Sequence, residues 1–282
     1  MDKRIVVNAD DFGLCAGVNR AVAQAHADGI LTSATIMTNM PAAEEAVEIS
    51  SRLPTLGVGV HLNLTEGHPL SPKETVRPLL GRDGRFGRSV TKLAILSLAG
   101  PKCRSAIRTE LAAQIRWAID RGIRPTHLDS HKHFHALPVL YSMICQLARR
   151  FGIRVIRFAL EPAEVSEIPW PLAAEGGKNK AAFIRAMAKM NRLQNSDFIR
   201  TDATLGISHV GRMDLNFFKA VTLYNSARTV EIMTHPGFAD GLDPANTTLV
   251  AQRKMELDAL CDPRAKQLFS DARIRLVHYG QL

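Results

Sequence analysis

Residues 125–135 read Pro-Thr-His-Leu-Asp-Ser-His-Lys-His-Phe-His, so a short strand-like run leads directly into a cluster of histidines. Four of the ten histidines in the chain lie between His127 and His135, together with Asp129. Histidine is the commonest metal ligand and the side chain that titrates nearest to neutral pH. We therefore expect this strand to end at a metal-centred site.

The spacing within the cluster limits how far the strand can continue. His127, Asp129, His131, His133 and His135 share one parity, so a continued strand would project all five side chains to one side. Five ionisable groups on one buried face are very costly without a metal or a dense hydrogen-bond network. Some of them therefore belong to the turn after the strand. The alternative is a surface run of histidines, which the apolar neighbours in this stretch disfavour.

Other apolar, strand-like runs also carry polar side chains at or near their ends. They are residues 4–9 leading into Asp10 and Asp11, residues 57–64 containing His61, and residues 229–234 leading into His235. Alone, each of these residues has a second interpretation. The aspartates could cap a helix, His61 could be a hydrogen-bonded core histidine, and His235 could be a turn histidine before Pro236. Together with the cluster, they suggest a divalent cation, a general base and a general acid.

Apolar strand-like runs alternate with helical patterns about seven times along the chain, which predicts a parallel sheet covered by helices. Both a (β/α) barrel and an open doubly wound sheet satisfy this alternation. Barrel enzymes build their sites at the C-terminal ends of several strands, whereas an open sheet concentrates its site at one switch point. Polar residues at four strand ends therefore favour the barrel. No Gly-x-Gly-x-x-Gly follows the first strand, which disfavours a nucleotide cofactor.

The predicted elements fill most of the chain, and a length of 282 residues suits a single barrel domain spanning residues 1–282. We expect strands at 4–9, 33–38, 57–64, 125–129, 153–160, 203–210, 229–234 and 273–277. We expect helices at 17–28, from about 41, and at 104–121, 137–150, 181–194, 213–225 and 246–261. Residues 66–103 and 161–200 are less regular, and we interpret them as insertions containing a lid.

The amino-acid composition limits the kinds of molecule that this protein is expected to bind. The chain is 46% hydrophobic and 22% charged, with a net charge of +9. This charge permits an anionic substrate or peripheral contact with a membrane. No Lys/Arg run exceeds two residues and no nucleic-acid-binding motif is visible, so we expect no nucleic-acid partner. No apolar run is long enough to cross a bilayer. The four cysteines are widely separated, which indicates reduced thiols and a cytoplasmic location.

Several motifs make this sequence resemble the YdjC-like carbohydrate deacetylase family over essentially its whole length. They are Asn8-Ala-Asp-Asp-Phe-Gly13, Thr32-Ser-Ala34, Gly59-Val-His-Leu62, Thr126-His-Leu-Asp-Ser-His131-x-His133 and Glu231-Ile-Met-Thr-His-Pro-Gly-Phe238. The resemblance implies a TIM-barrel-like α/β fold of about seven parallel strands, of the polysaccharide-deacetylase type. Lys132 stands where the family often has a histidine, between the two histidines of the fourth motif.

The resemblance also implies roles for individual residues. Asp11, His61 and His131 would hold one divalent metal ion, which could be zinc or magnesium, or else cobalt, nickel or manganese. Asp10 would be the general base and His235 the general acid. His127, Asp129 and His133 would support the ligands or contact the substrate.

The expected reaction is hydrolysis of the acetamide of an N-acetylated sugar, either an oligosaccharide or a glycolipid, to acetate and an amino sugar. The basic charge suits an anionic glycan, a nucleotide-sugar or a membrane-facing glycolipid. Alternatives are a metal-dependent hydrolase acting on a phosphoester or glycosidic bond, and a non-catalytic sugar-binding relative. A monomer and a homodimer are both compatible with the sequence.

Overall fold

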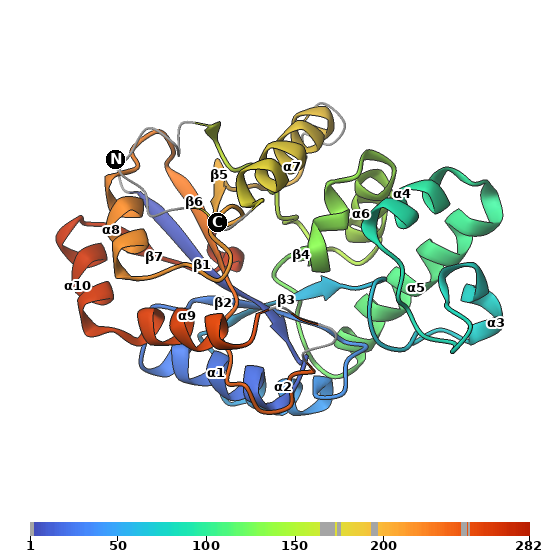
Figure 1. Ribbon diagram of the computed structural model, residues 1–282, viewed down its shortest axis with the longest axis horizontal. Helices are drawn as coiled ribbons and strands as arrows, with labels where there is room; N and C mark the ends of the chain where they lie inside the picture. Colours follow the sequence, from blue (N-terminus) through green and yellow to red (C-terminus); the bar gives the residue numbers. More distant parts are fainter. Residues whose placement is uncertain (1–2, 164–172, 174–175, 193–196, 244–246, 248) are drawn as a thin grey trace.

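The computed structural model describes residues 3–163, 173, 176–192, 197–243, 247 and 249–282. Seven parallel strands form one sheet in the order β4-β3-β2-β1-β6-β5, and β7 pairs with the start of β1. The strands are β1 (Arg4–Phe12), β2 (Ser33–Ile36), β3 (Gly57–Leu62), β4 (Leu128–Ser130), β5 (Ala203–Leu205), β6 (Thr229–Thr234) and β7 (Arg275–Leu276). The sheet curves into a half-barrel with helices outside it (Figure 1), so the expected TIM-barrel-like α/β fold is confirmed.

The helices connect and cover these strands. They are α1 (Ala16–Ala27), α2 (Ala43–Ser51), α3 (Lys73–Val76), α4 (Val90–Leu98), α5 (Pro101–Asp120), α6 (Pro138–Arg150), α7 (Gly177–Asn191), α8 (Leu215–Leu223), α9 (Ala251–Cys261) and α10 (Pro263–Asp271). Short 3-10 turns are η1 (Arg77–Leu79), η2 (His131–Ala136) and η4 (Tyr279–Gln281). Helix α1 packs on β1 and α5 packs on β3, so both helices shield the outer face of the sheet.

The strand predicted at 153–160 is wrong. This segment makes only isolated parallel bridges, Leu128↔Ile156 to β4 and Val155↔Ile199. It then turns sharply, because the N–H of Leu160 donates to the carbonyl of Phe158, two residues back. Such a tight turn interrupts a regular ladder. The segment nevertheless spans the space between β4 and β5, and it carries Arg157 into the barrel.

Two other differences concern helices. Helix α10 was not predicted as a separate element, although Asp262 caps it and Pro263 occupies its first turn. Those two residue types are a usual start signal for a helix. The region 66–103 holds α3, η1 and α4, which all pack on α5. The irregular region predicted at 161–200 lies partly outside the described residues, as does the predicted start of the helix at 246–261.

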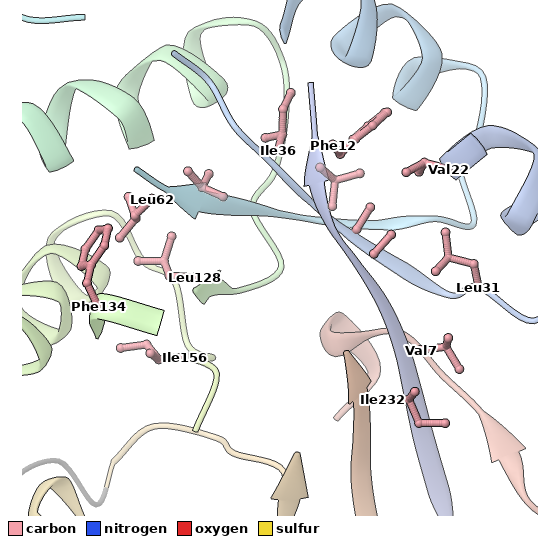
Figure 2. Close-up of a cluster of buried hydrophobic side chains, with 14 of the residues drawn as sticks. Val7, Phe12, Val22, Leu31, Ile36, Leu62, Leu128, Phe134, Ile156 and Ile232 are labelled. Atoms are coloured by element: carbon pink, nitrogen blue, oxygen red, sulfur yellow. The ribbon is translucent and has the colours of Figure 1, made fainter. Parts of the chain in front are cut away.

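The main hydrophobic core lies between the sheet and the helices. Side chains that alternate along each strand point either into this core or into the barrel interior. Figure 2 shows Val7 and Ile232 among the buried apolar side chains of this core. On β1, Ile5, Val7 and Ala9 belong to that outer core, whereas Val6 belongs to a small separate cluster with Val155, Val277 and Tyr279. Successive side chains of a strand point to opposite faces. The barrel interior is therefore apolar around Val6, near the start of β1. It becomes polar toward the C-terminal end of this strand, where Asn8 and Asp10 project into it.

Gly59 on β3 provides a test of this interior packing. A Cβ atom at Gly59 would lie 2.5 Å from ring atoms of His127 and 2.7 Å from its carbonyl oxygen. The His127 ring cannot easily move aside, because it stacks on Tyr279 with ring centroids 3.9 Å apart. We expect Gly59→Ala to lower the free energy of unfolding by about 1–3 kcal/mol, measured by urea denaturation. Gly87→Ala is the control, because nothing lies within 4 Å of its Cβ position. Equal stability of the two variants would contradict this packing.

Candidate active site

Asp10 and Asp11 are consecutive residues of β1, yet both line the same cavity. A regular strand would point them to opposite faces. Here the register with β2 shifts between Ala9 and Phe12, and Asp11 adopts a left-handed φ of 67°. A bulge re-aims a side chain in this way, and aspartate tolerates the left-handed region better than most residues. The bulge therefore brings both carboxylates to one site.

The cavity opens at the C-terminal ends of the strands and has a volume of about 1230 Å³. Six of the residues singled out in the sequence line it, namely Asp10, Asp11, His61, His131, His133 and His235. His127 and Asp129 do not line it, because both are completely buried behind its wall. The strand ends thus meet where the barrel prediction placed them.

Asp11, His61 and His131 form a compact group of potential ligands. Their ligand atoms all lie within 4.8 Å of one another. The Asp11 Oδ1 atom is 2.9 Å from Nδ1 of His131 and 3.5 Å from Nε2 of His61. Two imidazole nitrogens and one carboxylate oxygen at these separations can converge on a single cation.

The second nitrogen of each histidine also has a carboxylate partner. His61 Nδ1 is 2.7 Å from Asp129 Oδ1, and His131 Nε2 is 3.2 Å from Glu66 Oε1. Ligand histidines usually have such a partner, which fixes the orientation of the ring. Glu66 was not predicted to belong to the site, although it follows the polar end of the third strand. Its position in Thr65-Glu-Gly67 is the signal that could have identified it.

The charges of these histidines reflect the carboxylates around them. Burial alone would lower the pKa of His131, but Asp11 and Glu66 together raise this pKa to about 9. Burial likewise opposes a proton on His61, whereas Asp129 and Asp10 raise its pKa. The carboxylates therefore favour the protonated form of both rings. A cation bound by these ring nitrogens would replace those protons.

A second possible ligand group, Asp10 with His61 and Asp129, fits a metal poorly because Arg157 already occupies its carboxylates. The Arg157 side chain is fully buried. Its guanidinium lies 2.6 and 2.8 Å from the two Asp10 oxygens, 2.7 Å from Asp129, and 2.6 and 2.8 Å from Glu231. Three of these contacts are hydrogen bonds, one from Nε to Glu231 and two from the terminal nitrogens to Asp10, and the other two are ion pairs. Arg157 was not predicted to belong to the site, because it lies inside the strand-like run 153–160 and not at its end.

Arg157 also sets the ionisation of Asp10. Burial would raise the pKa of Asp10, but the charges of Arg157 and His61 outweigh it and hold this pKa below its usual range. The side-chain amide of Asn8 donates to Asp10 as well, over 2.9 Å. Asp10 is consequently an ionised, oriented carboxylate at neutral pH, with its oxygens beside His61 Nε2 at 4.0 Å.

Asp11 has a separate arginine. Arg253 on α9 approaches its Oδ2 atom to 2.6 Å, which leaves Oδ1 toward the two histidines. Burial opposes ionisation of Asp11, yet the charges of His131 and Arg253 hold its pKa well below the usual range. Asp11 therefore presents one oxygen as an anionic ligand while Arg253 fixes the other.

His235 follows β6 and lines the opposite part of the cavity wall. Its backbone N–H donates to Glu256 over 2.6 Å, and its buried Nδ1 has no hydrogen-bond partner among the described residues. Burial lowers the pKa of His235 to about 4, although Asp10 and Asp11 act in the opposite direction. The ring is therefore neutral at pH 7 in the free protein.

The rest of the histidine cluster lies in η2, the turn after β4. Lys132 and His133 adopt left-handed φ angles of 56° and 55°. His133 lines the cavity, and its buried Nδ1 has no partner within the described part of the chain. His135 turns away from the cavity, and its Nδ1 lies 2.8 Å from Ser130 Oγ. The expected change from strand to turn thus occurs between Ser130 and His131.

The comparison with known proteins agrees with the motifs. The family model described as YdjC-like protein matches residues 4–271. The chain belongs to the YdjC-like family. The resemblance of the sequence motifs to this family is therefore confirmed.

Relatives of this YdjC-like protein match it over nearly its full length. It is 32% identical over 279 residues to a carbohydrate deacetylase of Brevibacillus brevis, covering 99% of both chains. It is 31% identical over 283 residues to a chitooligosaccharide deacetylase of an Enterobacter species, covering 98% of both. Carbohydrate deacetylases are hydrolases of amide C–N bonds, and the enzyme class expected from the sequence is confirmed.

A solved structure shares the fold. The crystal structure of an Enterococcus faecalis V583 protein, named for cellobiose-phosphate cleavage, superposes with a TM-score of 0.81 and 25% identity. The match covers 100% of this chain and 99% of that one. Among the described residues, no helix combines the length and apolar character needed to cross a bilayer.

Replacement of Arg157 tests the buried charge network. We expect Arg157→Met to lower the free energy of unfolding at pH 7 by about 3–5 kcal/mol, because three buried carboxylates lose their cation. The loss should shrink toward pH 5, since carboxyl groups whose pKa has risen can then take up protons. Urea denaturation at both pH values measures this. Arg121→Met is the control, because the Arg121–Glu44 ion pair is largely exposed and should contribute little. A similar, small change in both variants would refute the network's role.

Proposed function

We propose that this YdjC-like protein is a metal-dependent N-deacetylase of N-acetylated sugars. The observation that carries this proposal is the group of Asp11, His61 and His131 in the cavity wall, with the ionised Asp10 beside it. A cation held by the trio would lie next to a carboxylate that can accept a proton. That combination suits hydrolysis of an amide bond.

The residues present fit a divalent ion. Four buried carboxylates face only two buried arginines in this part of the described structure, namely Asp10, Asp11, Asp129 and Glu231 against Arg157 and Arg253. Two positive charges would balance the difference. A ligand set of two imidazoles and one carboxylate suits zinc, cobalt, nickel or manganese, and magnesium is the oxygen-preferring alternative. When bound, such an ion polarises an acetamide carbonyl and makes water easier to deprotonate.

Asp10 would act as the general base. Arg157 and Asn8 fix its orientation, so the carboxylate is already in place before a substrate arrives. Its depressed pKa ensures that it is ionised at neutral pH, at the expense of basicity. Asp10 would take a proton from the attacking water as a bond forms between that water's oxygen and the acetamide carbon.

His235 would deliver a proton to the departing amine nitrogen. The ring is neutral in the free protein, but Asp10 and Asp11 already favour its protonated form against burial. Negative charge that develops on the substrate oxygen would add to their effect. His235 would then be protonated when the carbon–nitrogen bond breaks, which yields acetate and the free amine.

The charged residues at the rim of the cavity suggest the charge of the sugar substrate. Arg85, Lys180 and Arg212 line the cavity with exposed side chains, and no ion pair between described residues involves them. These cations suit an anionic glycan. We assign His133, which lines the cavity, to contact with the sugar. We assign substrate selection to the cavity-lining residues within 66–103 and 161–200, because both regions contribute to the cavity wall of one catalytic domain spanning residues 1–282.

The alternative reactions receive less support from the geometry. A glycosidase needs two carboxylates across the sugar. Asp129 is buried behind the wall against His61 and Arg157, so it does not supply a second carboxylate across the sugar from Asp10 and Asp11. We place the enzyme in the cytoplasm, since all four cysteines, each within the described residues, carry free thiols.

A pair of variants separates metal binding from catalysis. We expect His131→Ala to lose both the bound metal and acetate release from N,N′-diacetylchitobiose or an anionic analogue. Asp10→Asn should keep the metal and lose about 10²–10⁴-fold in rate, because only the proton acceptor is removed. Metal content and acetate are measured on the same samples. Full activity of metal-free His131→Ala would rule out the proposed centre, and normal turnover of Asp10→Asn would remove Asp10 from the mechanism.

The role of His235 is tested with two leaving groups. We expect His235→Asn to lower kcat for the acetamide by about 10²-fold or more, because a departing amine requires a proton. The same variant should hydrolyse p-nitrophenyl acetate with a much smaller loss, since p-nitrophenolate leaves without protonation. Equal losses on both substrates would show that His235 acts in some other way than as the acid.

A further inference from the structure

Three segments of the chain carry positive charge and contain no acidic residue. Residues 86–109, 131–160 and 176–192 hold five Lys or Arg each and no Asp or Glu. They thus contain fifteen of the 36 basic residues of the chain and none of its 27 acidic ones. These segments include α4, η2, α6 and α7. Their composition differs sharply from that of the chain as a whole.

These segments are neighbours in space. Helix α6 contacts both α4 and α7, and the turn η2 contacts all three helices. Figure 1 shows α6 between α7 and α4 on one side of the barrel. These four elements therefore form one continuous region, which we call the basic face and define as α4, η2, α6 and α7. It holds eight of the fifteen basic residues.

The basic face also exposes large apolar side chains. Ile95 and Leu98 on α4 are 54% and 69% exposed, and Phe183 and Met190 on α7 are 55% and 56% exposed. The spacings of three and seven residues place each pair on one side of its helix. Exposed lysines accompany them, namely Lys92 on α4, and Lys178 and Lys189 on α7. The inner face of helix α7 is thus apolar, and its outer face carries further apolar side chains. All charged residues of this helix are basic.

We propose that the basic face docks onto the surface of an anionic lipid membrane. Exposed apolar side chains on a basic helix can enter the boundary between headgroups and acyl chains. Lysine and arginine beside them are attracted to the negative headgroups. The two features occur on the same helices, which matches this combined mode of binding.

Charge complementarity separates the membrane from other occupants. A symmetric dimer through this face would place basic residues of one copy against basic residues of the other, and two acidic partners at this face, Glu66 and Asp197, already pair with Lys132 and Arg149 within each copy. A nucleic acid would satisfy the positive charge, but it offers no apolar layer for Ile95, Leu98, Phe183 and Met190. An anionic bilayer satisfies both the charge and the apolar side chains.

Docking would orient the cavity toward the membrane. Gly87 lines the cavity three residues before α4 begins, and Gly177 and Lys180 in the first turn of α7 line it as well. Both helices therefore start at the cavity rim. A substrate presented at the bilayer surface would lie close to this rim. This consequence rests on the proposed function, whereas the docking itself does not.

Co-sedimentation of the full chain with vesicles tests the proposal. Vesicles of phosphatidylcholine with phosphatidylglycerol are compared with vesicles of phosphatidylcholine alone, at low and physiological salt. We expect binding to the anionic vesicles only, weakened by salt. Phe183→Ser/Met190→Ser and, separately, Lys178→Gln/Lys189→Gln should each lower the partition constant at least tenfold. Leu223→Ser/Met255→Ser is the matched control, because both residues are 55% exposed but lie on α8 and α9. This control should bind like the unaltered protein.

Other outcomes would overturn the proposal. They are no binding to anionic vesicles, equal losses in the control and α7 variants, and binding that is insensitive to Phe183 and Met190 but is displaced by DNA. Thermal unfolding of each variant identifies any loss caused by misfolding, and Lys178→Gln/Lys189→Gln removes no apolar contact. Acetate release from a soluble substrate is measured in parallel and should be unchanged in all variants. Loss of vesicle binding with normal acetate release would therefore contradict only the docking proposal. Loss of acetate release in the unaltered protein would contradict the proposed deacetylase activity.

Discussion

A single buried cation holds the interior of this barrel together. Arg157 reaches from an irregular segment across the half-barrel to Asp10 on β1, Asp129 on β4 and Glu231 on β6. Ionised carboxylates at these depths would be prohibitively costly without it. Arg157 pairs with Asp10 and Asp129, whereas the neighbouring Asp11 pairs with Arg253 through Oδ2 and directs Oδ1 toward His61 and His131. The position of the site therefore depends on Arg157, although this residue does not line the cavity.

Backbone strain completes the arrangement at two strand ends. The bulge at Asp11 and the consecutive left-handed residues Lys132 and His133 are uncommon conformations for residues other than glycine. Each occurs where a strand delivers a polar side chain to the cavity. Strain of this kind persists only where the surrounding structure enforces it. Here the rigid parallel sheet provides that enforcement, and α5 and α6 support its edge.

The sequence predicts much of this architecture for physical reasons. Apolar runs with polar ends identified β1, β3, β4 and β6, because buried parallel strands read as continuous hydrophobic stretches. The same ends brought Asp11, His61 and His131 together in the predicted place. Glu66 follows the third strand and could have been assigned in this way, whereas Arg157 and Arg253 could not, since neither stands at the end of an apolar strand-like run. The segment 153–160 reads as a strand by composition, yet its hydrogen bonds follow a turn that only the tertiary structure determines.

The central claim is that a metal at Asp11, His61 and His131 is required for hydrolysis of an N-acetylated sugar. The most direct measurement is acetate release by the unaltered protein, compared before chelation, after complete chelation and after addition of one equivalent of divalent metal. The account predicts about one bound metal per chain, loss of acetate release on chelation and recovery on reconstitution. Undiminished acetate release from protein shown to contain no metal would contradict it.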